Sequence, residues 1–249
     1  VSVSSPVLSF LVLQFASLRI TLVLDALSFF LAFGLVALLP KKEEKTLGEK
    51  KLTFRVIFSD IKEGVHYIVK QEEIFFLLVM ASSVNFFFAA FNYLLPFSNQ
   101  LYGVQGAYAT ILTMGAIGSI VGALLASKIK ASMEMLLFLL ALTGLGVMIM
   151  GFTLPSYLAF SGNFICELFM TIFNIHFFTQ VQTKVEGEYL GRVLSSIYTL
   201  AILFMPLATG LMTLLPSIHL YSFLIIGLGV VALSFLALGY VRTHFEKET

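Results

Sequence analysis

Long apolar stretches recur along the whole chain, and they constrain its fold more than any other feature. The 249 residues are 59 % hydrophobic and only 12 % charged, whereas soluble domains carry roughly 25 % charged residues. A helix needs about 20 residues to cross the hydrocarbon core of a bilayer. We therefore predict an all-α membrane protein whose spans are 20–39, 74–95, 107–127, 134–152, 156–179, 193–215 and 219–241.

The basic residues gather in alternate connections between these stretches. They fall within 41–70, 128–130 and 184–192 and after residue 241, and the intervening turns carry none. Fourteen of the 15 basic residues therefore share one side, and only Arg19 lies on the other. Because basic loops stay on the cytoplasmic side, we predict a multi-pass protein of the cell membrane with a cytoplasmic C-terminus.

The segment 40–73 is the one sizeable polar piece of the sequence. It begins with the mixed charges of 41–45 and continues with apolar residues at helical spacing, among them Phe58, Ile61 and Ile68. This pattern predicts a cytoplasmic linker with an amphipathic helix in the membrane interface. The helix is either a connector packed under the bundle or a regulatory element.

Beyond the linker, the spans form two triplets, 74–152 and 156–241. An odd number of spans per triplet inverts the second relative to the first, as in inverted-repeat transporters. Polar residues concentrate in four spans, which we expect to line a cavity: 74–95, 107–127, 156–179 and 193–215. The spans 134–152 and 219–241 are nearly devoid of them, and we expect these two to face lipid.

Glu167 is the one acidic residue at the centre of a span, where an ionised side chain costs about 3 kcal/mol or more. Asn163, Thr171 and Asn174 lie at i−4, i+4 and i+7, so a helix places all four on one face. Such a carboxyl group tends to retain a proton. We expect the four residues to exchange protons or bind substrate, and the alternative for Glu167 is a structural hydrogen bond to another helix.

Other polar and aromatic residues within the spans are further candidates. Asn85 and Asn92 share a helix face and either line the cavity or join helices, and Phe88 could present its ring to a flat apolar substrate. Asp25 lies near a membrane interface, where a structural role is expected. Close helix packing is the expected role of three glycines: Gly115, Gly118 and Gly122.

Several classes of protein are excluded by missing motifs. The sequence contains neither an HExxH zinc motif nor a P-loop, and its single Cys and four His form no ligand cluster. We therefore expect no enzyme activity, no cofactor and no bound metal. The net charge of +1 gives no indication of nucleic-acid binding.

Three motifs resemble successive landmarks of one transporter family. They are Asp25-Ala26-Leu27-Ser28-Phe29, the stretch from Asp60 to Ile68, and Gly191-Arg192-Val193-Leu194-Ser195. Their order and spacing are similar to those of the macrolide-efflux-like and enterobactin-exporter-like branch of the major facilitator superfamily. The resemblance covers essentially the whole chain.

This resemblance implies a domain organisation. Residues 1–39 would be a remnant of the N-terminal half, made of a short stub and the sixth transmembrane helix. Residues 40–73 would be the central linker, 74–241 the C-terminal six-helix bundle, and 242–249 a cytoplasmic tail. The chain is expected to be part of a longer protein whose N-terminal half is its partner.

The resemblance also implies a function, namely proton-coupled export of amphiphilic, macrolide-like drugs by alternating access. Such an antiporter would confer antibiotic resistance. Gly191 and Arg192 would form a cytoplasmic turn in which Arg192 binds helix-end carbonyls or a carboxylate, unless it is only a snorkelling arginine. The alternatives are a siderophore or lipid carrier of the same fold, a membrane scaffold and a truncated, non-transporting protein.

Overall fold

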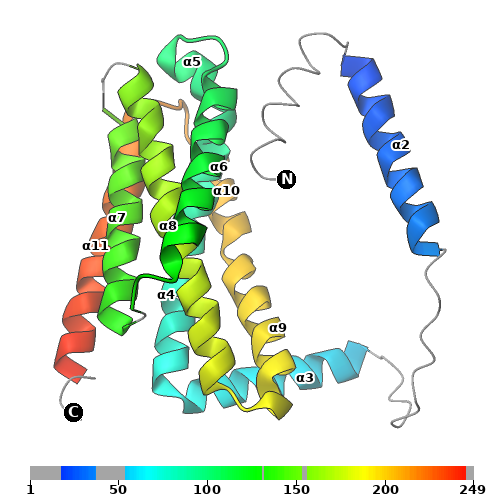
Figure 1. Cartoon of the computed structure of the whole chain (residues 1–249), viewed down its shortest axis with the longest axis vertical. Helices are drawn as coiled ribbons and strands as arrows, with labels where there is room; N and C mark the ends of the chain where they lie inside the picture. Colours follow the sequence, from blue (N-terminus) through cyan, green and yellow to red (C-terminus); the bar gives the residue numbers. More distant parts are fainter. Residues whose placement is uncertain (1–17, 38–53, 131, 153–155, 245–249) are drawn as a thin grey trace. The chain divides into compact units, whose positions relative to one another are not determined.

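The computed structural model describes residues 18–37, 54–130, 132–152 and 156–244 (Figure 1). The chain divides into two compact units, Val1–Ile57 and Phe58–Thr249. Within the first unit, α2 (Leu18–Ala37) is a helix of 20 residues at the position of the first predicted span. The predicted stub, the charged part of the linker and the last residues of the tail lie outside the described residues.

The remaining described residues are almost entirely helical, as the bilayer requires, because only intrahelical bonds can satisfy the backbone there. The elements are α3 (Phe54–Lys70), α4 (Glu72–Leu94), η1 (Leu95–Phe97), α5 (Ser98–Tyr102), α6 (Ala107–Ala126), α7 (Met133–Met150), α8 (Ser156–Lys184), α9 (Gly187–Leu203), α10 (Met205–Thr213) and α11 (Tyr221–His244).

Six helical stretches of the described chain are long and apolar enough to cross a membrane. They coincide with the six spans predicted after residue 73. Their bounds are Glu72–Tyr102, Ala107–Ala126, Met133–Met150, Ser156–Lys184, Tyr189–Thr213 and Tyr221–His244. Helix α3 occupies the position of the predicted amphipathic helix, and it buries Ile68 completely.

The fifth of these stretches is interrupted near its middle. Helix α9 ends at Leu203, and α10 resumes at Met205 with Pro206 in its first turn. Proline has no N–H to donate but is tolerated in the first turn of a helix. The break therefore falls where Pro206 is expected to kink the span.

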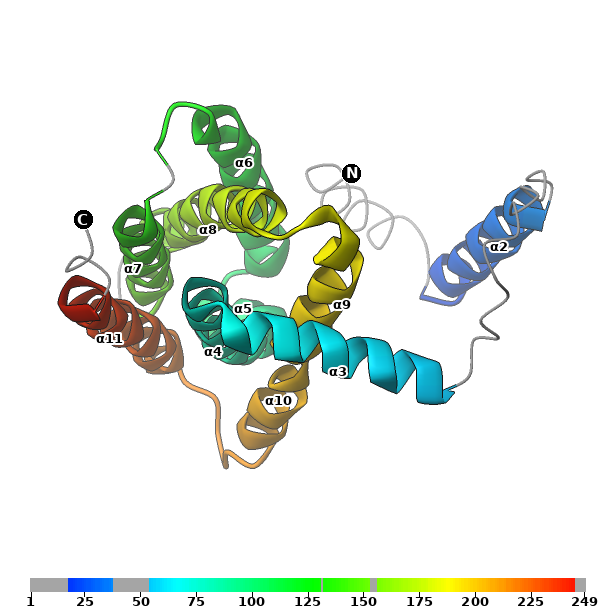
Figure 2. The same ribbon diagram turned by 90° about the horizontal axis from the view of Figure 1, so that it is seen from below.

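The helices pack as an inverted repeat predicts. The first triplet is α4, α6 and α7, and the second is α8, α9 with α10, and α11. Helix α8 packs against α6 and α7, just as α4 packs against α9 with α10 and against α11, and α7 packs against α11. Exchanging the two triplets maps this set of contacts onto itself (Figure 2). The two triplets therefore form one interleaved bundle.

Three glycines bring α6 against the backbone of α8. A Cβ atom on Gly118 would collide with the carbonyl oxygen of Phe164, and one on Gly122 would collide with that of Leu168. A Cβ on Gly115 would meet the side chains of Asn163 and Glu167. Small residues let membrane helices approach this closely, so the glycines have the packing role expected from the sequence.

This close approach predicts opposite effects for two glycine-to-alanine substitutions. Gly118→Ala should destabilise the bundle by about 1–3 kcal/mol, the usual cost of overpacking. In contrast, Gly239→Ala in α11, where a Cβ has no neighbour within 4 Å, should stabilise it by about 0.5–1 kcal/mol. Thermal unfolding midpoints in detergent measure both changes. Equal midpoints for the two variants would contradict the glycine contact.

Candidate functional site

Glu167 lies on α8 and faces α6. The hydroxyl of Ser119 on α6 donates a hydrogen bond of 3.2 Å to Glu167 Oε2. Within the described part of the chain, the ion pairs are elsewhere, at the end of the bundle near α3, and none involves Glu167. The half-buried carboxyl group is therefore held by a neutral donor.

Asn163, one turn before Glu167, also connects α8 to α6. Its side chain is 2 % exposed, and Nδ2 donates a 2.8 Å hydrogen bond to the carbonyl oxygen of Ile111. Its Oδ1 atom is buried and has no hydrogen-bond partner among the described residues. Asn163 thus joins two helices and keeps one acceptor unused close to Glu167.

A cavity of about 300 Å³ lies between α4, α8 and α9; we call it the asparagine pocket. Asn85 of α4 and Asn174 of α8 contribute its amides. Asn85 donates a 3.0 Å hydrogen bond from Nδ2 to the carbonyl oxygen of Ala81 in its own helix. This bond does not use the acceptor oxygen Oδ1 of Asn85. The aromatic part of the lining consists of Phe173, Phe177, Phe178 and Tyr198.

The aromatic side chains of this pocket are stacked on one another. The rings of Phe178 and Tyr198 lie 5.4 Å apart at 25°, and those of Phe173 and Phe177 lie 5.8 Å apart at 22°. Stacked rings present flat apolar surfaces, and the two amides add hydrogen-bonding groups. The pocket therefore suits a molecule with an apolar body and a few polar atoms.

The structure brings only part of the predicted site together. Asn163 and Glu167 contact α6, whereas Asn174 lies seven residues beyond Glu167, about 10 Å along the helix at 1.5 Å per residue. Thr171 is half-buried between them. The predicted polar face of α8 therefore starts at the contact with α6 and ends in the asparagine pocket.

The three residues expected to line a cavity have different surroundings. Asn85 lies at the pocket. Asn92 is exposed, while Phe88 is 8 % exposed and packs edge-on against Phe91 at 5.8 Å between ring centroids. The side chain of Asp25, within α2, lies outside the described part of the structure.

Arg192 binds a carboxylate of the linker helix. Its Nη1 atom lies 3.0 Å from Glu63 Oε2 of α3, and beside this pair the rings of Tyr67 and Tyr189 stack at 4.8 Å. A Cβ on Gly64 would lie 2.7 Å from the carbonyl oxygen of Arg192. Helix α3 is therefore docked directly on α9.

Two further ion pairs at this end of the bundle connect the end of α8 to the start of α4 and the end of α11 to the start of α7. Lys184 pairs with Glu73, and Arg242 Nε lies 2.7 Å from Glu134 Oε1. Gly191 is exposed, and a Cβ there would have no neighbour within 4 Å. The structure therefore gives no steric reason for glycine at this position.

The sequence interpretation did not identify Ser119 as the hydrogen-bond donor to Glu167 or the aromatic residues that line the asparagine pocket. Ser119 is one of several polar residues in its span. Only its place beside Gly118, one of three glycines spaced three or four residues apart, could have indicated contact with another helix. The aromatic lining of the pocket carried no signal, because the sequence holds 26 Phe and 9 Tyr. No group of three or more potential metal ligands occurs in the described residues.

Six apolar spans, an inverted repeat and a polar pocket within the bundle define the architecture of a secondary transporter. The comparison with protein families agrees, because the family described as Major Facilitator Superfamily matches residues 1–201. The chain belongs to the Major Facilitator Superfamily and is thus a multi-pass membrane transporter rather than an enzyme. No significant match is found among curated proteins or solved structures.

The contact between α3 and α9 predicts which substitutions release the linker helix. Glu63→Gln should have a small effect, about 0.2–1 kcal/mol, because the pair with Arg192 is exposed. Tyr67→Ala should loosen α3 more, because it removes both buried area and a ring stack worth about 0.5–1.5 kcal/mol. Hydrogen exchange of α3 in detergent measures this, with His66→Ala as the exposed control. Greater loosening by Glu63→Gln would contradict this order.

Proposed function

We propose that the protein takes part in proton-coupled export of amphiphilic compounds, macrolide-like drugs among them. The observation that carries this proposal is the asparagine pocket, which combines aromatic walls with the amides of Asn85 and Asn174. By the positive-inside rule, the basic end of the bundle would lie in the cytoplasm.

Glu167 is the proposed proton carrier. Because Ser119 is a neutral donor, it supports the carboxyl group without supplying the positive charge that would hold Glu167 permanently ionised. An ionisable residue inside a span is energetically costly, and where one occurs it usually has a function. Glu167 lies about 10 Å along α8 from Asn174 of the asparagine pocket. Protonation of Glu167 and binding of a substrate in the pocket would therefore both act on α8.

The pocket itself favours an amphiphile over an anionic siderophore. The described residues that line it include no basic side chain, and a siderophore rich in carboxylates or catecholates would leave its charge uncompensated there. A lipid carrier of the same fold and a non-transporting membrane protein remain as the alternatives that an efflux experiment separates.

Glu167→Gln tests the proton carrier. The variant keeps the size of the side chain and its hydrogen-bonding ability but cannot release a proton, so pH-driven efflux of a fluorescent amphiphile should fall to background. Efflux is measured in membrane vesicles under an imposed pH gradient. Glu134→Gln is the control, because Glu134 pairs with Arg242 at the end of the bundle and should retain efflux.

The result distinguishes the alternatives. Unchanged efflux and proton coupling in Glu167→Gln would overturn the role of Glu167. Absence of amphiphile efflux in the unsubstituted protein, tested at the same expression level, would favour the lipid carrier or the non-transporting protein.

Tyr198→Ala tests the aromatic wall of the pocket. Loss of one aromatic contact, about 0.5–1.5 kcal/mol, should raise the KM for an aromatic amphiphile by about two- to tenfold. Tyr221→Ala is a matched control, because Tyr221 is 56 % exposed and Tyr198 is 53 % exposed, and because Tyr221 stacks on His219 and is not among the residues described as lining the pocket. Equal KM changes in the two variants would indicate that the pocket does not bind substrate.

A further inference from the structure

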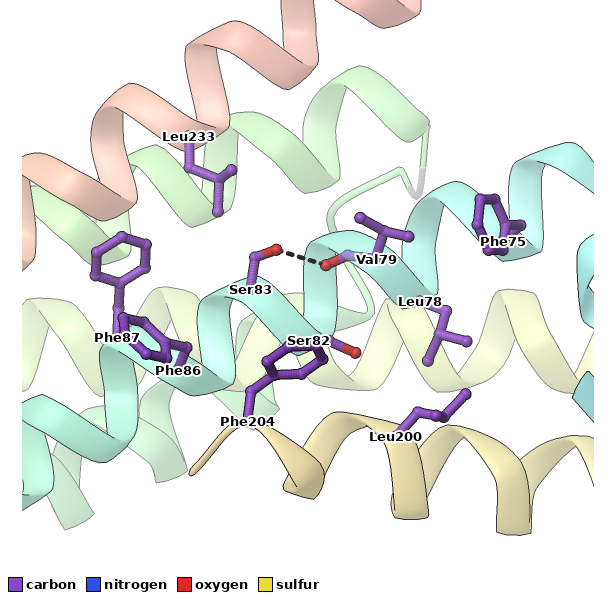
Figure 3. Close-up of a pocket in the computed structure, with 10 residues that line it drawn as sticks. All are labelled: Phe75, Leu78, Val79, Ser82, Ser83, Phe86, Phe87, Leu200, Phe204 and Leu233. Carbon is purple, nitrogen blue, oxygen red and sulfur yellow. Dashed lines mark hydrogen bonds between the residues drawn. The ribbon is translucent and has the colours of Figure 1, made fainter. Parts of the chain in front are cut away.

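A second cavity, of about 440 Å³, lies on another side of α4, between α9 and α11. Figure 3 shows α4 as its floor, with Leu200 and Phe204 on one wall and Leu233 of α11 on the other. We call it the α4–α11 groove. It shares no lining residue with the asparagine pocket.

Among the described residues, the lining of the α4–α11 groove is apolar apart from two serines and includes no charged side chain. Ser83 donates its hydroxyl hydrogen to the carbonyl oxygen of Val79 at 2.8 Å, and Ser82 is 6 % exposed. An occupant gains little by bringing polar groups here, because a buried polar group without partners is costly. The groove therefore suits a hydrocarbon.

The groove opens sideways at the depth of the membrane spans. Three of its lining residues are well exposed: Phe75 (43 %), Val79 (46 %) and Phe204 (42 %). Its floor runs along one face of α4 from Phe75 to Phe87, and both residues lie within the span Glu72–Tyr102. A lateral opening at this depth gives access to lipid tails rather than to water.

The length of the floor matches one lipid tail. Twelve steps of about 1.5 Å make it about 18 Å long, whereas one leaflet contributes about 15 Å, half of the hydrocarbon core of about 30 Å. The far end is closed by aromatic rings: Phe86 and Phe87 meet edge-on at 5.6 Å, and the Phe87 ring lies against Gly229 of α11. A straight chain entering from the basic end would fill the floor and stop there.

We propose that the α4–α11 groove binds one acyl chain of a membrane lipid, from the leaflet at the basic end of the bundle, as a tightly held lipid. The tail fills the space that α9 and α11 leave over α4 and contributes the dispersion contacts that an empty groove would lack. This lipid is separate from any transported substrate, so the inference does not depend on the proposed export.

The absence of Trp from the sequence allows a direct test with a single introduced fluorophore. Phe204→Trp places the reporter on the rim of the groove. Phe235→Trp is the matched control: Phe235 is 56 % exposed, and it follows Leu233 by two residues, which turns it to the other side of α11. Both variants are reconstituted into vesicles of phosphatidylcholine with brominated acyl chains, which quench Trp emission, and into unbrominated vesicles as reference.

In brominated bilayers, both reporters should lose most of their emission. After extraction into detergent and washing, Phe235→Trp should recover its emission because its lipid is exchanged, whereas Phe204→Trp should stay quenched by the retained tail. Adding Ser83→Leu to Phe204→Trp fills the groove and should restore emission in detergent.

Equal recovery of the two reporters would overturn the proposal, because it would mean ordinary lipid contact only. Lack of quenching of Phe204→Trp in the brominated bilayer would overturn it as well, since another segment of this chain or a second copy would then cover the groove. Displacement of the retained tail by the amphiphile of the efflux assay, at concentrations that saturate efflux, would reassign the groove to substrate.

Discussion

The close approach of α6 to α8 is the contact on which the site depends. In hydrocarbon no hydrophobic driving force pulls helices together, so association depends on close packing and on hydrogen bonds between helices. Gly118 and Gly122 place α6 against the backbone of α8, which brings Ser119 within reach of Glu167. Bulkier residues in the glycine positions would separate the helices and leave the carboxyl group without its donor.

Glycines also set the contacts of α7 with α8 and α11. Gly146 of α7 faces Gly162 of α8, and Gly144 of α7 faces Gly227 of α11, with a Cβ on Gly144 only 2.8 Å from the Gly227 carbonyl oxygen. Helix α7 is thereby held between α8 and α11. On the opposite side of the bundle, α4 meets its neighbours through large side chains such as Phe91, whose ring contacts Phe223 at 5.8 Å.

This difference in packing explains why both cavities lie along α4. Aromatic side chains keep neighbouring helices apart, and the space between them is filled incompletely. On one side the gap contains Asn85 and becomes the asparagine pocket. On the other it contains only two serines among apolar side chains and becomes the α4–α11 groove. One helix thus separates a polar cavity from an apolar one.

The sequence by itself determined the helical class, the six spans after residue 73 and the packing role of Gly118, because each follows from local chemistry: apolar length or a missing side chain. It also singled out Glu167, since a carboxyl group in mid-span is unusual wherever it points. Only the tertiary structure decided that Ser119 is its donor, that Asn85 and Asn174 meet, and that Phe88 is packed in the core. Those outcomes depend on how neighbouring helices rotate and cross, and the period of a single helix cannot specify that.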